Sequence, residues 1–375
     1  MVYFDNAATT PVPKAVADAM YEVLTAHFGN PSSQYPIGVE MKKAVEGWRA
    51  VIAGALGCPA ERLYFTSCGT ESDNWAIQAA LWQNRHRGRH IITTAVEHSA
   101  VLESCRWLES EGYQVTYLKP DSTGMVSARQ VLDAVREDTV LVSMMLVNNE
   151  NGCRLPVENV FRMVKRNDPE IITHCDAVQG FLKIPFKPRT LCADLVSVSG
   201  HKVHALKGVG ALYIRHGVRV KPILCGSEQE RGLRPGTESV PLIASFGAAT
   251  EKLSLNIEER LERVSQLRSS LIAQLREMDG VIIRDIEGAS PYVLNISLLG
   301  YRSEIVLHYL EQREVYVSSG SACSKGASSG VLELFGAKPA EVDSALRISF
   351  CAENTEEDIA ALVQGLRDAQ KELMH

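Results

Sequence analysis

Two polar residues lie where predicted strands end, and their types suit an aldehyde cofactor. Lys202 comes just after the strand Leu195–Ser199, and Asp176 directly follows the strand region that begins at Glu170, with Gln179 one turn further on. Open α/β sheets bind ligands at the carboxyl ends of their strands. An amine there can form a Schiff base with an aldehyde, and a carboxylate there can keep a pyridinium nitrogen protonated. Taken singly, each has a plainer explanation, Lys202 as a surface lysine and Asp176 as a helix cap.

Two further positions at strand ends suit an anion and a proton transfer. Gly69 and Thr70 precede the helix predicted over Glu71–Gln83, where backbone N–H groups and a hydroxyl can bind a phosphate. The same pattern also occurs as an ordinary capping motif. His98 follows the strand His90–Thr94 and can lie over a cofactor ring and carry protons, although a lone loop histidine commonly has no function. The coincidence of four such signals at strand ends favours one site.

Cys323 lies in a run of small, polar and glycine residues over 318–330, which predicts a mobile loop. The thiolate is the nucleophilic form of cysteine, and a mobile thiol can visit a cofactor and then an acceptor. The plainer alternative is an incidental thiol in a surface loop. The chain has 9 cysteines and no Cys-x-x-Cys pair, which favours free thiols in a reducing, cytoplasmic compartment.

The elements that must position these residues alternate between short apolar strands and amphipathic helices. This alternation predicts an α/β fold with a mostly parallel sheet of seven strands, covered by helices on both faces. The predicted strands are Leu63–Thr66, His90–Thr94, Gln114–Leu118, Val140–Leu146, Glu170–His174, Leu195–Ser199 and Gly210–Ile214.

The pattern changes after about Pro241. A long amphipathic stretch over 242–278 predicts one helix or two in series, and an α+β unit with a strand over Val315–Ser318 follows. We therefore expect a large domain over 1–255 and a small one over 256–375. Whether the N-terminal arm packs with the small domain stays open at this point.

The bulk composition excludes some classes of function. With 39 basic and 45 acidic residues, the net charge of −6 gives no electrostatic reason to expect binding to nucleic acid or to a membrane. No apolar run approaches the roughly 20 residues that cross a bilayer, and the first residues lack the pattern of a secretory leader. We expect a soluble protein.

Nearly end to end, the sequence resembles the cysteine desulfurase branch of the fold type I pyridoxal-phosphate enzymes. The motifs that carry the resemblance follow in order along the chain. They are Asp5-Asn6-Ala7-Ala8-Thr9-Thr10-Pro11, Gly29-Asn30-Pro31-Ser32-Ser33, Thr66-Ser67-Cys68-Gly69-Thr70-Glu71-Ser72-Asp73-Asn74, Glu97-His98, Asn148-Asn149-Glu150, Asp176-Ala177-Val178-Gln179, Ser199-Gly200-His201-Lys202, Arg234-Pro235-Gly236-Thr237-Glu238 and Ser319-Gly320-Ser321-Ala322-Cys323.

The resemblance implies a role for each matching residue around pyridoxal 5'-phosphate. Lys202 is implied to hold the cofactor and later to move the Cα proton, Asp176 to pair with the pyridine nitrogen, and Gln179 to bind the phenolic oxygen. His98 is implied to stack on the ring. The implied phosphate ligands are Thr70 beside Gly69, Ser199, His201 and, from the neighbouring subunit of a homodimer, Thr237, while Asn149 and Arg347 are implied to hold the substrate carboxylate.

The implied reaction takes sulfur from L-cysteine, gives L-alanine and leaves a persulfide on Cys323 for a sulfur-acceptor protein. The pathway served, iron–sulfur cluster assembly or thiolation of tRNA or a cofactor, stays open. Two departures from the family bear on the acceptor. The stretch after Cys323 is about two residues shorter than in the long-loop class, with 327–330 in place of its acidic and proline residues, and Phe181 and Leu182 are bulkier than usual.

Three alternatives remain. The same fold supports selenocysteine lyase activity, and a scaffold without turnover can keep the fold while binding a sulfur acceptor. A zinc site built from His201, His204 and Cys175 has weak ligand spacing, so no metal is expected.

Overall fold

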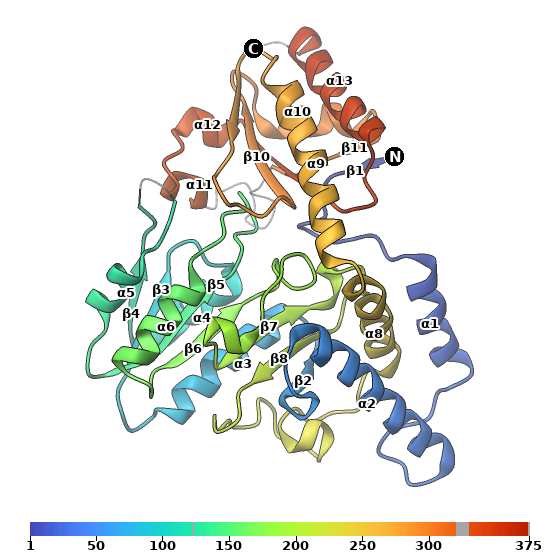
Figure 1. Cartoon of the computed structure of the whole chain (residues 1–375), viewed down its shortest axis with the longest axis vertical. Coiled ribbons are helices and arrows are strands. Elements are labelled where there is room, and N and C mark those ends of the chain that lie inside the picture. The colour runs from blue at the N-terminus through green and yellow to red at the C-terminus, as the bar shows by residue number, and fades with distance from the viewer. Residues whose placement is uncertain (122–123, 320–329, 374–375) are drawn as a thin grey trace.

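The computed structural model describes residues 1–121, 124–319 and 330–373, and it contains a large sheet with a smaller α+β unit above it in the view of Figure 1. The strand order of the large sheet is β2-β8-β7-β6-β5-β3-β4. β8 is antiparallel to both of its neighbours, and all other neighbours pair in parallel, as the alternation of elements predicted. The strands are β2 (Leu63–Thr66), β3 (His90–Thr94), β4 (Gln114–Leu118), β5 (Thr139–Met145), β6 (Ile172–Asp176), β7 (Leu195–Ser199) and β8 (Gly210–Ile214).

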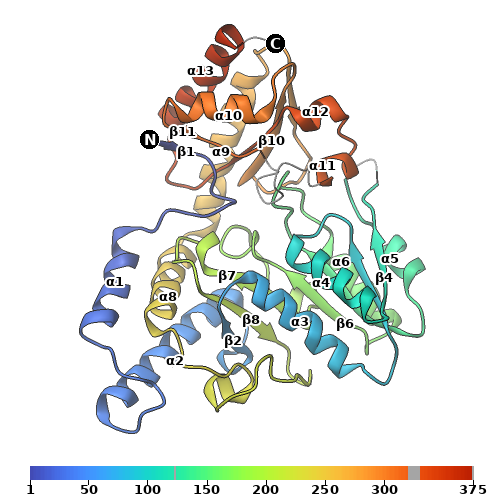
Figure 2. The same cartoon turned by 180° about the vertical axis from the view of Figure 1, so that it is seen from behind.

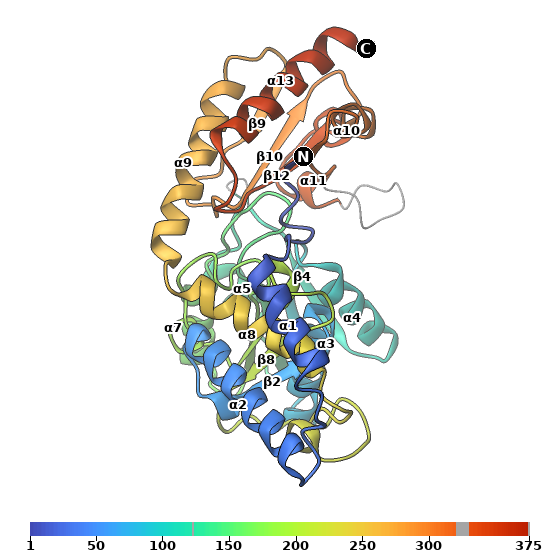
Figure 3. The same ribbon diagram turned by 90° about the vertical axis from the view of Figure 1, so that its right-hand side faces the viewer.

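Helices cover both faces of this sheet, so its central strands are buried on both sides. Ile91 and Leu195 belong to one core with α3 and α4, whereas the adjacent residues Ile92 and Val196 belong to another core with α2, α6 and α8. Figure 3 shows α4 and α7 on opposite sides of the sheet. Because both faces are covered, polar strand residues such as Thr93 and Ser197 are buried together with the apolar ones. The helices are α1 (Lys14–Thr25), α2 (Pro36–Leu56), α3 (Gly69–Gln83), α4 (Ser99–Ser110), α5 (Ala128–Ala134), α6 (Val157–Asn167), α7 (Pro188–Leu191) and α8 (Val240–Ser254).

The smaller unit has its own sheet and core. Its antiparallel sheet has the order β12-β10-β9, and the helices α9, α10 and α13 contribute residues to its core. Figure 2 shows this unit from behind, next to the N-terminus. Its elements are α9 (Ile257–Leu275), β9 (Val281–Arg284), β10 (Val293–Leu298), α10 (Ser303–Glu311), β11 (Val315–Tyr316), α11 (Val331–Leu334), α12 (Pro339–Asp343), β12 (Ala345–Ser349) and α13 (Glu356–Glu372).

The N-terminal arm packs with the smaller unit, which answers the question left open by the sequence. Strand β1 (Val2–Tyr3) pairs in parallel with β11, placing Val2 opposite Val315. Phe4 is fully buried in the small core, with its ring centroid 5.4 Å from that of Phe350. The first residues therefore connect the small core to the large sheet.

Several predicted boundaries shift in the structure; β5 starts and ends one residue earlier than predicted, and α3 begins at Gly69. Asp176 is the last residue of β6, which begins at Ile172 because the backbone N–H of Glu170 donates to the side chain of Asp168 in a turn. The stretch over 242–278 is two helices, α8 and α9, and β11 ends at Tyr316. The division at 255 and 256 falls between the two helices and stays a prediction. None of the helices in the described ranges is both long and apolar enough to cross a bilayer.

Candidate active site

Lys202 ends a short 3-10 helix, Gly200–Lys202, that follows β7 directly. Gly200 permits this tight turn, because a Cβ there would lie 2.9 Å from Val209 and 3.2 Å from Ala205. The Lys202 Nζ donates to the backbone carbonyls of Ala7 and Ala8, both at 2.7 Å. The N-terminal arm thus lies directly against this lysine, with its carbonyl groups facing the amine.

Asp176 lies at the carboxyl end of β6, the strand next to β7. Its Oδ1 accepts from the backbone N–H of Val178 at 2.9 Å. Burial raises the pKa of this carboxyl group, and the charge of Lys202, with that of His98 when its ring is protonated, opposes that rise. The structure therefore brings together the aspartate, lysine and histidine that the sequence predicted for one site.

His98 is the N-cap of α4. Its Nδ1 accepts from the backbone N–H of Ala100 at 3.1 Å, so the neutral ring carries its proton on Nε2. Burial lowers the pKa of His98, the charge of Lys202 lowers it further, and Asp176 acts in the opposite direction. At neutral pH the geometry thus favours a neutral imidazole with a defined tautomer.

A corner suited to an anion lies where β7 ends and α3 begins. The Ser199 Oγ is buried and has no hydrogen-bond partner among the described residues. Gly69 is the first residue of α3, and a Cβ there would lie 3.0 Å from Val178 and 3.5 Å from the Ser199 Cβ. Thr70 is exposed beside it. A helix N-terminus with an unpaired buried hydroxyl is suited to a phosphate group.

His201 lies between Ser199 and Lys202 in the chain, and its Nδ1 is 3.4 Å from the Thr9 hydroxyl. Burial first, and then the charge of Lys202, lower the pKa of His201 to about 4. The ring is therefore neutral at neutral pH. A neutral imidazole can still donate one N–H to an anion.

Arg347 and Asn149 lie together, as predicted, through the backbone of Asn149. The Arg347 Nη1 donates to the Asn149 carbonyl at 3.2 Å, and its Nη2 forms an ion pair with Asp5 at 2.8 Å. The sequence did not predict the contact with Asp5, because the two residues are 342 positions apart. The guanidinium is buried and its Nε has no partner among the described residues.

Cys323 lies outside the described residues, so the structure does not place its thiol. Thr237 is described and exposed, in the loop that leads to α8. Three residues earlier, Arg234 forms an ion pair with Glu71 of α3 at 2.9 Å, which holds this loop beside the start of α3.

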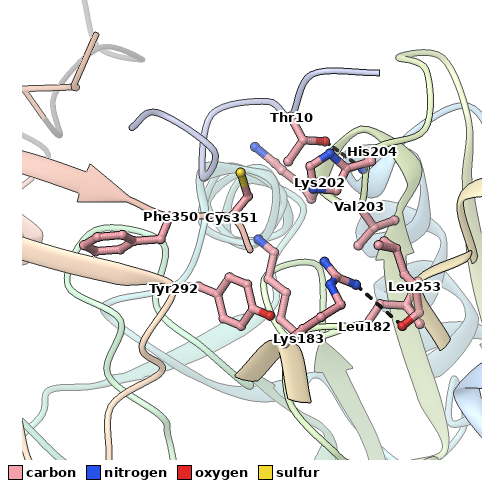
Figure 4. A pocket seen from close by; sticks show the side chains of 11 residues that line it. Thr10, Leu182, Lys183, Lys202, Val203, His204, Leu253, Tyr292, Phe350 and Cys351 are labelled. Atoms are coloured by element: carbon pink, nitrogen blue, oxygen red, sulfur yellow. Dashed lines mark hydrogen bonds between the residues drawn. The ribbon is translucent and has the colours of Figure 1, made fainter. Parts of the chain in front are cut away.

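A small cavity adjoins Lys202 on the side of the small unit. Figure 4 shows Lys183, Tyr292 and Cys351 among its lining side chains, together with Lys202. Its volume of about 10 Å³ is roughly the space that one water needs. Sequence reasoning missed Lys183. The available signal was its place four residues after Gln179, in an otherwise apolar run.

The structure groups His204 differently from the zinc site considered above. His204 lies with Cys351 and Glu353, the three possible ligand atoms being within 4.8 Å of one another. The His204 Nδ1 is paired with the Pro11 carbonyl at 2.9 Å. Lys183 and Arg260 line the neighbouring cavity, and their positive charges disfavour a metal ion there; we assign none to this cluster.

Comparison with known proteins places this geometry in a family. Residues 2–362 match the family model described as Aminotransferase class-V. The chain is 42% identical to cysteine desulfurase IscS of Methanosarcina thermophila, covering 97% of this chain and 90% of that protein. It is 39% identical to putative cysteine desulfurase IscS 1 of Bacillus subtilis, covering 99% of each.

Solved structures agree with the sequence comparison. A structure described as a NifS-like protein superposes with a TM-score of 0.94 at 38% identity, covering 99% of this chain and 100% of that one. A structure of SspA in complex with cysteine gives a TM-score of 0.82 at 32% identity, covering 95% of this chain and 100% of that one. The chain therefore belongs to the class-V aminotransferase family and, within it, to the cysteine desulfurases.

Proposed function

We propose that this cysteine desulfurase holds pyridoxal 5'-phosphate on Lys202, takes sulfur from L-cysteine and carries it as a persulfide on Cys323. The observation that supports this most directly is that three residues lie together at one edge of the large sheet. Asp176 ends β6, Lys202 follows β7, and His98 follows β3. Their charges act on one another, as the pKa shifts of Asp176 and His98 indicate. Perturbed titratable groups of this kind are typical of active sites.

The residues present fit the cofactor. The buried Ser199 hydroxyl lacks a partner among the described residues, and the close approach at Gly69 leaves the start of α3 open to a phosphate. Asp176 is a buried carboxyl group whose ionised form needs a positive partner, which a protonated pyridine nitrogen provides. When bound, the cofactor supplies an electron sink for the substrate Cα.

Side chains of this chain then move the protons and hold the substrate. The Lys202 amine takes the Cα proton of the substrate and later gives it back as a general acid. His98 Nε2–H, at the ring nitrogen not used in capping α4, can donate a proton to the substrate. Arg347 and the segment at Asn149 hold the substrate carboxylate. The Arg347 guanidinium releases the Asp5 carboxylate and binds the carboxylate of the substrate in its place.

Sulfur transfer needs the thiol at Cys323. The thiolate attacks the substrate sulfur, forming the S–S bond while the C–S bond breaks and its electron pair stays on carbon. Protonation of that carbon completes alanine, and the enzyme keeps the sulfur as a persulfide. The atoms and electrons balance without a further oxidant or reductant. The persulfide then passes to an acceptor protein, in cluster assembly or in thiolation.

Assembly and location belong to the same proposal. We infer a homodimer, because the exposed Thr237 is then available to the phosphate of a neighbouring subunit. The 9 cysteines without a pairing framework support a reducing compartment, the cytoplasm.

Turnover of L-cysteine by the purified protein tests the proposal. Lys202→Ala should abolish alanine formation, and Cys323→Ala should abolish the protein-bound persulfide and most of the alanine. Cys225→Ala is the matched control, since Cys225 is an exposed free thiol in the described structure. Its activity should equal that of the wild type.

Two results would count against this function. Alanine formation that survives Lys202→Ala would remove the amine from the chemistry. Turnover of selenocysteine alone would make the protein a selenocysteine lyase, and failure to bind the cofactor would favour a scaffold.

A further inference from the structure

Lys183 is a buried cation beside the proposed site, and its environment is unusual. It is 6% exposed and lies seven residues after the end of β6. Its Nζ donates to the Gln179 Oε1 at 2.9 Å. No carboxylate in the described ranges is paired with it, although buried charges normally have an opposite charge nearby.

A short chain of hydrogen bonds connects Lys183 to Lys202. Gln179 accepts from Lys183 with its Oε1 and donates with its Nε2 to the Ala7 carbonyl at 2.9 Å. The same carbonyl accepts from Lys202 at 2.7 Å. Figure 4 shows Lys183 and Lys202 lining one cavity. The two lysines are therefore part of one connected polar group.

The chemistry of the two ends fixes the orientation of the Gln179 amide. An ammonium group has only donors, so the atom facing Lys183 must be the amide oxygen. A carbonyl only accepts, so the atom facing Ala7 must be the amide nitrogen. Without Lys183, the Gln179 side chain loses the contact that keeps its N–H groups on the Lys202 side.

Burial makes this arrangement costly to keep. Burial first, and then the charge of Lys202, lower the pKa of Lys183 to about 7. An apolar side chain of similar length would fill the same space without losing the hydration of an ammonium group. Packing alone therefore does not account for a lysine here.

We propose that Lys183 is a positioning residue for the cofactor site, which holds the Gln179 amide with its N–H groups toward Lys202 and places a second positive charge beside that amine. This inference rests on the proposed function, because it concerns the same cofactor. A like charge nearby opposes protonation of an amine, and an oriented N–H donor favours the ionised form of a phenolic oxygen. Both effects keep the site in its reactive protonation state at lower pH.

Several other titratable groups face Lys183 and contribute to any pH dependence. Some of these groups shift the pKa of Lys183, and the charge of Lys183 shifts the pKa of others. They are Lys202, Cys351, Arg260 and Arg347, with His201, His204 and the Tyr292 ring at 5.9 Å.

The test compares three variants of the full-length protein loaded with pyridoxal 5'-phosphate. Lys183→Met removes both the donor and the charge, whereas Lys183→Gln keeps a neutral donor. Lys207→Met is the matched control, because Lys207 is an exposed lysine whose charge also acts on His201. The readouts are the pH midpoint of the visible cofactor band, the dissociation constant of the cofactor, and the urea midpoint of unfolding.

We expect Lys183→Met to raise the pH midpoint by about one unit and to weaken cofactor binding by roughly tenfold. Lys183→Gln should recover much of the binding but not the pH midpoint, since it restores the donor without the charge. Lys207→Met should change neither. The urea midpoint of Lys183→Met should equal or exceed that of the wild type, which separates a positioning role from a structural one.

The proposal is overturned if Lys183→Met leaves both the pH midpoint and the dissociation constant unchanged, or if Lys207→Met shifts them equally. A lower urea midpoint with an unchanged spectrum assigns Lys183 to stability instead and also overturns it. If the wild-type protein itself gives no visible band, the proposed function fails first, and this inference fails with it.

Discussion

Three buried carboxyl groups, Asp73, Glu97 and Asp176, lie close enough to act on one another beneath the site. Burial raises the pKa of each, and Asp176 raises those of both Asp73 and Glu97 further. At Asp176 the charge of Lys202, and that of His98 when its ring is protonated, oppose the rise. The charges that face Asp176 favour its ionised form, whereas burial makes the neighbouring acids hold their protons more readily.

Glu97 illustrates how such a neutral acid serves the fold. Its Oε1 accepts from the Thr94 hydroxyl at 2.6 Å and from the backbone N–H of Met145 at 2.9 Å. These bonds hold the loop that carries His98 against β5. Burial raises the pKa of Glu97 to about 8, so the carboxyl group is mostly protonated at neutral pH.

The first prediction follows from this raised pKa. Between pH 4.5 and 8 the unfolded chain releases the Glu97 proton while the folded chain retains it. The contribution of Glu97 to the unfolding free energy is therefore complete below pH 4.5 and is lost as pH rises, by about 1.4 kcal/mol per pH unit. Glu97→Gln, which keeps the shape and cannot ionise, should remove this slope in urea unfolding measured at pH 5, 6 and 7.

Glu103→Gln provides the control for this measurement, since Glu103 is an exposed residue of α4 paired with Arg106. Its slope should match that of the wild type. An unchanged slope in Glu97→Gln would show that Glu97 is ionised in the folded protein.

At the scale of elements, the N-terminal arm connects the two units at the site. Ala7 and Ala8 give their carbonyls to Lys202, while Asp5 pairs with Arg347 of β12. Thr10 donates its hydroxyl to the carbonyl of His201 at 2.9 Å. The arm therefore contacts both Lys202 and Arg347, and its position helps to fix the distance between these two side chains.

A second element contact holds the loop that leads toward Thr237. Arg49 of α2 forms a bidentate ion pair with Glu230, with both N–O distances at 2.7 Å, and the two side chains are 3% and 2% exposed. Glu230 also accepts from the backbone N–H of Phe65 in β2 at 2.8 Å. One buried pair thus connects a helix, a strand and this loop.

The second prediction concerns this pair. Arg49→Met leaves the Glu230 carboxylate buried without its partner and should cost about 3–5 kcal/mol of unfolding free energy. The double variant Arg49→Met with Glu230→Gln should recover part of the loss, because no buried charge remains. Urea unfolding of the wild type, both single variants and the double variant gives the coupling energy. Strictly additive losses would mean that the two side chains do not act as a pair.

At the scale of the whole molecule, the proposed homodimer gives each site a residue from its neighbour. Thr237 is exposed, although Arg234 in the same loop is held at α3 of its own chain. A hydroxyl that approaches the phosphate from a second subunit makes the two sites depend on each other. Hybrid dimers test this dependence directly.

The third prediction is that Lys202→Ala and Thr237→Ala variants, each weak alone, recover activity when their subunits are mixed. In a mixed dimer, one site combines an intact Lys202 with the intact Thr237 of the other subunit. Random exchange should then give about a quarter of the wild-type alanine formation. If Thr237 serves its own subunit, or if the protein is a monomer, mixing recovers nothing. Mixing two batches of Lys202→Ala is the control.

The sequence by itself determined the alternating α/β architecture and the family, because strands buried on both faces and turn motifs at their ends are local patterns. It also predicted Lys202, Asp176 and His98 as one group, since neighbouring parallel strands end at the same edge. Asp176 proved to be the last residue of β6 instead of following it, which is a small shift at a strand end.

Only the tertiary structure decided which distant segments complete that group. The contacts of Ala7 with Gln179 and Lys202 span 172 and 195 positions, and Arg347 pairs with Asp5 across 342. In the sequence Lys183 is one polar residue in an apolar run, and only the fold places its ammonium against Gln179. The physical reason is that hydrogen bonds and burial depend on position in the folded chain, and local propensity carries no information about such remote partners.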